Sequence, residues 1–245
     1  MQQTDILSMN RTEKIAGGIF FALYLFVLPF AANPLFSTLS DLWDIAIPDN
    51  ICSMILYYIL FACTLLIFRD SLATETARFL SHRWHTLYSA ALGLTAYYVL
   101  STLSHYALEH TLSGIVNLND LTFSTQIHSA PHSTALIVIF LAPFIEESLF
   151  RGYVFGNLRE RSRCAAYVLS CLLFAFLHIW QFALTNQNPS YLLLTLQYLV
   201  PGLVLAWTYE YSGTLWGNIL LHTGINALSV WTCLSPYLTA KEPLC

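Results

Sequence analysis

The chain has 245 residues, of which 56% are apolar and only 10% are charged, and its mean hydropathy is +0.59. A soluble domain carries about 25% charged residues, so this chain lacks the polar surface that it would need in water. The net charge of −4 and the lack of basic runs in the sequence argue against a nucleic-acid partner. The composition therefore predicts an all-α, polytopic membrane protein whose surroundings are the lipid bilayer.

Windows of about 20 residues predict seven membrane-spanning helices, because each apolar run is long enough to cross about 30 Å at 1.5 Å per residue. These helices are expected near residues 15–32, 51–68, 86–108, 134–155, 164–183, 191–209 and 214–234. The last two are the least well separated, since only residues 210–213 lie between them. We expect residues 1–245 to form one transmembrane domain of seven or eight spans around an intramembrane polar cavity.

Lysine and arginine residues alternate between the predicted loops and set the expected orientation. Basic residues precede the first span and lie in the second and fourth loops, whereas the first, third and fifth loops have none. By the positive-inside rule the amino terminus is cytoplasmic and the carboxyl terminus lies on the opposite side, and only Lys241 breaks the alternation. The small size and short loops favour a prokaryotic protein of the inner (plasma) membrane.

Two adjacent glutamates and an arginine interrupt the fourth predicted span. Each such charge costs roughly 2.5–3.5 kcal/mol at the centre of a bilayer, so these side chains must face protein or water and have partners. Glu147 and Arg151 are four residues apart, so they share one helical face and are expected to pair. Glu146 points about 100° away from Glu147 and is expected to stay free for other work. Pro143 removes a backbone donor nearby and is expected to kink the helix.

Three further polar residues lie in the fifth and seventh predicted spans. His178 lies deep in one, and His222 and Asn226 lie one turn apart in the other. Taken singly, such residues are more often packing residues that hydrogen-bond between helices. Measured from the cytoplasmic ends at 1.5 Å per residue, however, Glu146, His178, His222 and Asn226 lie at depths of about 15, 20, 12 and 18 Å. We therefore expect these four residues to form one site.

The residue types of this set suit peptide hydrolysis. A partly desolvated carboxylate, Glu146, can act as a general base on a water that His178 also holds. His222 and Asn226 can donate hydrogen bonds to the developing oxyanion of a scissile amide. No Ser or Cys of the set lies beside a base, which disfavours an acyl-enzyme. Zinc remains an alternative, because Glu146, His178 and His222 match a catalytic ligand set, although the sequence has no HExxH motif.

The spacing of these residues resembles that of a known protease family, the CPBP family of CAAX proteases and bacteriocin-processing enzymes, also called Abi, which includes the Ras-converting CAAX prenyl endopeptidase. The resemblance rests on three motifs in order, within residues 134–230: Glu146-Glu147-x-x-x-Arg151, Phe174-x-x-x-His178 and His222-x-x-x-Asn226. Residues 1–133 resemble the family only as generic membrane helices, so we expect them to be accessory.

The resemblance implies an intramembrane endopeptidase that cleaves a membrane-associated protein or peptide near its carboxyl end or within a leader. The implied site has three pairs of residues with separate roles: Glu146 with His178 for the water, His222 with Asn226 for the oxyanion, and Glu147 with Arg151 for support. Members of the family have been described both as metalloproteases and as metal-independent glutamate proteases. We favour a site without a cofactor, because Asn226 suits an oxyanion donor better than a zinc ligand.

Two other functions remain open on the sequence. A proton-coupled transporter component also buries Glu, Arg and His at mid-membrane, although transporters usually show an internal repeat that this chain lacks. A catalytically silent immunity or scaffold protein would keep the same fold without turnover. Within the protease hypothesis, the sequence does not separate a prenylated cysteine motif, a bacteriocin leader and a sorting tail as substrates. Protein prenylation would be unexpected in a prokaryote.

Overall fold

The computed structural model describes residues 9–239, apart from the side chains of His110 and of residues 236–239. Within this range every regular element is a helix: α1 (Arg11–Ala22), η1 (Leu23–Val27), α2 (Leu28–Trp43), α3 (Asp49–Ile67), α4 (Arg69–Ser81), α5 (Arg83–Leu112), α6 (Leu118–Ser129), α7 (Pro131–Leu136), η2 (Ile137–Leu141), α8 (Ala142–Glu147), η3 (Ser148–Phe155), α9 (Gly156–Arg159), α10 (Arg163–Thr185), η4 (Pro189–Leu194), α11 (Thr195–Ser212) and α12 (Leu215–Thr239). The predicted all-α class is therefore confirmed.

Four continuous helical rods of the described chain are long and apolar enough to cross a membrane: Arg11–Trp43, Asp49–Ile67, Pro131–Arg159 and Pro189–Ser212. They match the first, second, fourth and sixth predicted spans, and they make the chain an integral membrane protein by composition. Helices α5, α10 and α12 occupy the other three predicted spans but are not among these four rods, and α10 contributes only the shorter apolar stretch Arg163–Leu177. A count of seven or eight spans is thus not shown.

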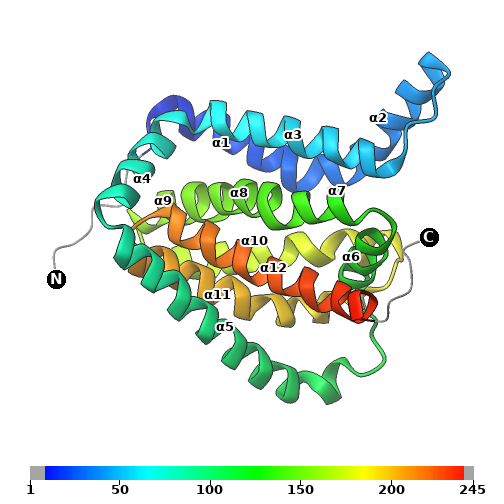
Figure 1. Cartoon of the computed structure of the whole chain (residues 1–245). Coiled ribbons are helices and arrows are strands. Elements are labelled where there is room, and N and C mark those ends of the chain that lie inside the picture. The colour runs from blue at the N-terminus through cyan, green and yellow to red at the C-terminus, as the bar shows by residue number, and fades with distance from the viewer. Residues whose placement is uncertain (1–8, 240–245) are drawn as a thin grey trace.

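The helices lie side by side in an elongated bundle (Figure 1). The rod of α1 and α2 and the neighbouring α3 cover one side, α5 and α11 lie on the other, and α8, α10 and α12 run between them. The rod Pro131–Arg159 is consequently an interior element, since 67% of its apolar 18-residue stretch is buried, compared with 22% for that of Arg11–Trp43. Its charged residues therefore face protein rather than lipid.

Helix α1 approaches the interior rod closely because it presents glycine there. A Cβ atom on Gly17 would lie 2.8 Å from Cε1 of Phe68 and 2.9 Å from Cδ2 of Tyr153, which leaves no room for a side chain. Four residues further along α1, the Phe21 ring meets the Phe150 ring edge to face at 5.5 Å. The amino-terminal rod is therefore seated directly on η3.

Two buried glutamates join helix ends at the end of the bundle where α1 begins. Glu13 accepts hydrogen bonds from the backbone N–H of Ser71 at 2.9 Å and from its hydroxyl at 2.8 Å, in the first turn of α4. Glu75 accepts a hydrogen bond from the backbone N–H of Leu215 at 2.7 Å, at the first residue of α12. A carboxylate at a helix amino terminus satisfies an unpaired N–H and is favoured by the helix dipole. Burial raises the pKa of Glu75.

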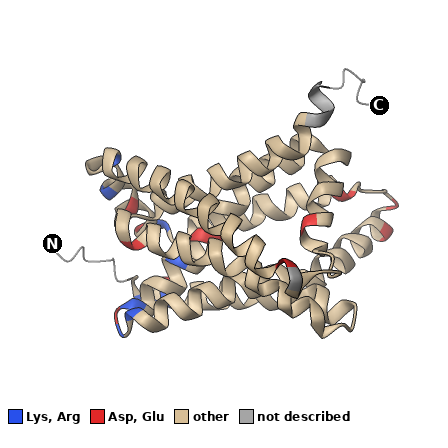
Figure 2. Ribbon diagram, turned by 90° about the horizontal axis from the view of Figure 1, so that it is seen from below, with Lys and Arg blue, Asp and Glu red and all other residues tan. Residues whose placement is uncertain are grey.

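The basic residues gather toward this same end, as the predicted alternation of loops requires (Figure 2). Ion pairs join separate elements there: Lys14 with Glu160 at 3.6 Å, Arg159 with Glu210 at 2.7 Å, and Arg163 with Glu210 at 2.6 Å. Lys241, which breaks the alternation, lies outside the described residues.

We predict that Gly17→Ala lowers the melting temperature of the protein in detergent, because the new methyl group overpacks two aromatic rings at a cost of about 1–3 kcal/mol. Gly224→Ala is the matched control, since a Cβ atom there meets only Leu94 methyl groups at 3.8 and 3.9 Å. Equal melting temperatures for the two variants, measured by differential scanning fluorimetry, would contradict the close seating of α1.

Candidate active site

The two adjacent glutamates lie at the end of α8, a six-residue helix between two π-helical segments, η2 and η3. A π-helical turn holds an extra residue and so changes the direction in which the following side chains point, and such turns are frequent at functional sites. The disturbance predicted at Pro143 is thus a change of helix type around Glu146 and Glu147. Both carboxylates point into the bundle, with 8% and 0% of each residue exposed.

The missing N–H of Pro143 is compensated from α12. Carbonyl groups about one turn before a proline lose their helical donor. Here Thr223 Oγ1 donates to the carbonyl of Ile139 at 2.9 Å, and Asn226 Nδ2 donates to the carbonyl of Val138 at 2.8 Å. These two hydrogen bonds fasten α12 to η2 and fix the Asn226 side chain. An amide carries two N–H donors, so Asn226 keeps a second one for another acceptor.

Glu147 is the centre of a buried polar network. As predicted, it pairs with Arg151, at 3.1 Å between Oε1 and Nη1, and neither residue is exposed. The same carboxylate also accepts hydrogen bonds from Nδ1 of His222 at 2.8 Å and from Nδ2 of Asn218 at 3.1 Å. The network therefore bridges the interior rod and α12. Both carboxylate oxygens of Glu147 are therefore engaged in hydrogen bonds within the protein.

The contact with Glu147 also determines which proton His222 carries. A carboxylate only accepts hydrogen bonds, so Nδ1 of His222 must be the protonated nitrogen. Nε2 is then a lone-pair acceptor in the neutral ring and a donor only in the imidazolium. The predicted oxyanion role of His222 consequently requires the charged ring.

Arg151 makes two further contacts that explain how the interior holds a guanidinium. Its Nη2 donates to the carbonyl of Gly202 in α11 at 3.0 Å, and its guanidinium lies 4.4 Å from the centre of the Phe174 ring of α10. The network thus joins the interior rod to α10, α11 and α12. Sequence reasoning missed Asn218, although it lies four residues before His222 and so on the same helical face.

Glu146 has a single hydrogen bond among the described residues. The hydroxyl of Tyr24, in η1, donates to its Oε1 at 3.3 Å. Its other oxygen, Oε2, has no hydrogen-bond partner in the described part of the chain, which agrees with the predicted division of work between the two carboxylates. Nothing in the sequence spacing pointed to Tyr24, which lies 122 residues before Glu146.

His178 is half-buried and is held by its own helix and by α11. Its Nδ1 donates to the carbonyl of Phe174 at 2.8 Å, and its ring stacks on that of Tyr198 with centroids 4.5 Å apart. The Tyr198 hydroxyl in turn donates to Asp120 in α6 at 3.1 Å. Partial burial raises the pKa of Asp120. With Nδ1 occupied, Nε2 of His178 is left as an acceptor.

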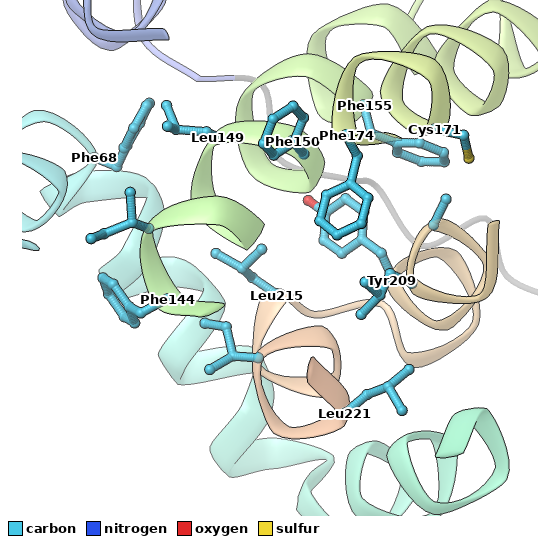
Figure 3. Packing of buried hydrophobic residues seen from close by; sticks show 14 of the residues in the cluster. Phe68, Phe144, Leu149, Phe150, Phe155, Cys171, Phe174, Tyr209, Leu215 and Leu221 are labelled. Carbon is cyan, nitrogen blue, oxygen red and sulfur yellow. The ribbon is translucent and has the colours of Figure 1, made fainter. Parts of the chain in front are cut away.

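The Phe174 ring is the common neighbour of these groups. It lies 4.8 Å from the ring of His178 and 5.9 Å from that of His222, and it packs edge to face on Phe150 (Figure 3). Glu146 and His222 both lie near enough to His178 for electrostatic interaction with its ring. The structure therefore brings three of the predicted residues into one region. No direct hydrogen bond joins Glu146 to His178 within residues 9–239.

The alternative zinc set does not fit this arrangement. No group of three His, Cys, Asp or Glu side chains among the described residues is placed to hold a metal ion. The Nδ1 atoms of His178 and His222 are both engaged, one with a helix carbonyl and one with Glu147, so only the Nε2 atoms could serve as ligands. Glu146, His178 and His222 thus lie in one region without converging on a ligand position.

A cavity of about 360 Å³ lies beside the site, between α5, α6 and α11. Asp120 and Gln197 are among its lining residues, and Tyr198, next to Gln197, stacks on His178. None of the four predicted catalytic residues lines it. This cavity therefore lies next to the site, on the side of His178 and Tyr198.

The fold and the site define a helical membrane protein with a buried acid–histidine centre built from α8, α10 and α12. Residues 128–228 match the family described as "Type II CAAX prenyl endopeptidase Rce1-like", and this segment is a domain of that family, within CPBP. The description of that family names an endopeptidase. No curated protein and no solved structure matches the chain. Helices α1 to α5 lie outside the matched segment.

We predict that Arg151→Met destabilises the protein by about 3–5 kcal/mol, because it leaves the Glu147 carboxylate buried without its charge partner. Arg151→Lys, which retains the charge but not the second N–H group that donates to the carbonyl of Gly202, should cost less. Denaturant unfolding in detergent micelles, followed by tryptophan fluorescence, measures both. Equal stability of Arg151→Met and the unaltered protein would contradict the structural role of the pair.

Proposed function

We propose that this protein is an intramembrane endopeptidase of the glutamic type. It would hydrolyse a peptide bond near the carboxyl end, or within a leader, of a membrane-associated protein or peptide. The observation that carries the proposal is the state of Glu146, a buried carboxylate with one oxygen held and the other free, in the same region as His178. The alternating basic loops support a cytoplasmic amino terminus.

The atoms of Glu146 and His178 that have no hydrogen-bond partner among the described residues suggest how a water would react in the site. Glu146 Oε2 and His178 Nε2 are both acceptors, so a water between them donates one proton to each and directs a lone pair at the carbonyl carbon. Glu146 takes up the proton as the C–O bond forms. It returns that proton to the leaving nitrogen as the C–N bond breaks, so the carboxylate is regenerated.

Residues of α12 would stabilise the negative charge that develops on the carbonyl oxygen. The second N–H of Asn226 and the Nε2–H of an imidazolium at His222 are the available donors, and oxyanion donors of this kind typically contribute about 2.7–4 kcal/mol each. Glu147 supports His222 by accepting a hydrogen bond from Nδ1, which fixes the orientation of the ring. Arg151 supports Glu147 in turn.

We predict that Glu146→Gln lowers peptide cleavage by at least about a hundred-fold, because an amide cannot take up the proton of the water. A pool of internally quenched peptides in detergent micelles serves as the probe, with mass spectrometry of the products. Glu160→Gln is the matched control, a partly exposed carboxylate of the ion pair with Lys14. Full retention of cleavage by folded Glu146→Gln would end the proposal and would favour a silent protein of the same fold.

We predict that a chelator leaves this cleavage unchanged and that the purified protein contains far less than one equivalent of zinc. The reason is that the described residues offer no set of three metal ligands. Elemental analysis and a chelation series measure both quantities. Loss of activity with EDTA, restored by added zinc, would replace the glutamic mechanism with a metal-dependent one.

A further inference from the structure

The amino-terminal rod contributes an atom to the candidate site although it lies outside the matched segment 128–228. Tyr24 comes from η1, the π-helical segment between α1 and α2, and only 7% of it is exposed. Its hydroxyl donates to Oε1 of Glu146 at 3.3 Å in the buried interior. This is the only hydrogen bond to Glu146 within the described chain.

Contacts on either side of Tyr24 fix the position of this rod. Before it, Gly17 and Phe21 seat α1 against η3, as described above. After it, Gln181 Nε2 of α10 donates to the carbonyl of Pro29 at 2.8 Å. The rod therefore touches both helices that carry the proposed water-activating groups, since Gln181 lies three residues after His178. The Tyr24 hydroxyl is thus delivered to Glu146 by a supported backbone.

We propose that Tyr24 is a positioning residue for Glu146. A carboxylate with two free oxygens can rotate about its terminal torsion, and a hydrogen bond to Oε1 restricts that rotation and directs Oε2 toward the water. The proposal rests on the proposed function in one respect, that Glu146 is the base. It gives the accessory rod a part in the chemistry rather than in packing alone.

A second tyrosine beside Glu146 provides a control, because it places a phenol ring near the carboxylate without a hydrogen bond to it. Tyr57 of α3 lies near enough to Glu146 for their charges to interact, yet its hydroxyl has no hydrogen bond to Glu146 among the described contacts. Tyr24→Phe and Tyr57→Phe are therefore a matched pair. Each removes one oxygen atom and keeps the ring, so neither should leave a cavity.

The first test is infrared spectroscopy of the purified protein in detergent, without substrate. The difference spectrum between the unaltered protein and Glu146→Gln identifies the carboxyl band of Glu146. We expect Tyr24→Phe to shift this band and Tyr57→Phe to leave it in place. An unshifted band in Tyr24→Phe would overturn the proposal, whatever the protein proves to cleave.

The second test is kinetic and uses one internally quenched peptide that the protein cleaves. We expect Tyr24→Phe to lower kcat about ten-fold or more with little change in KM, because the bond acts on the base and not on the bound peptide. Tyr57→Phe should keep kcat. A shifted band with unchanged kcat overturns the positioning role. Absence of cleavage by the unaltered protein counts against the proposed function, while the infrared result still decides the hydrogen bond.

Discussion

The interior of this protein depends on how it holds a guanidinium with no exposed surface. Arg151 would be costly in a bilayer, and its ion pair with Glu147 alone would leave lone pairs and N–H groups unsatisfied. Asn218, His222 and the carbonyl of Gly202 supply further contacts, although Nε of Arg151 is buried without a partner among the described residues. Because these partners come from α11 and α12, the charge fixes how those helices meet the interior rod. Glu146, the adjacent carboxylate, takes no part in this network.

Helix geometry within one element was enough to predict this division of labour. The spacing of four between Glu147 and Arg151 predicted their pairing, and the 100° turn to Glu146 predicted its separation, as the structure shows. The contact of Tyr24 with Glu146 was beyond such reasoning, because no periodicity links residues 122 positions apart. Asn218 lay within reach, since it shares a face with His222. It was missed because an asparagine alone in a helix suggests ordinary packing.

Two further differences involve the polar groups of the site. Pro143 predicted a disturbance of the helix, but only the packed structure shows that Asn226 supplies a donor to a freed carbonyl. Four helical rods are long and apolar enough to cross a membrane, whereas apolar runs in the sequence had suggested seven. In α10 the apolar stretch ends at Leu177, directly before His178, and α12 holds Asn218 and His222.

The two side-chain bonds from α12 to the carbonyls before Pro143 restrict how this bundle could open. Drawing α12 away from η2 would present unpaired carbonyl groups to hydrocarbon, at several kcal/mol for each group. A lateral gate along that seam is therefore energetically closed. A substrate of the proposed protease would have to enter between other helices. The cavity of about 360 Å³ along the carboxyl-terminal half of α5 is lined by residues of neither α12 nor η2, so it lies apart from that seam.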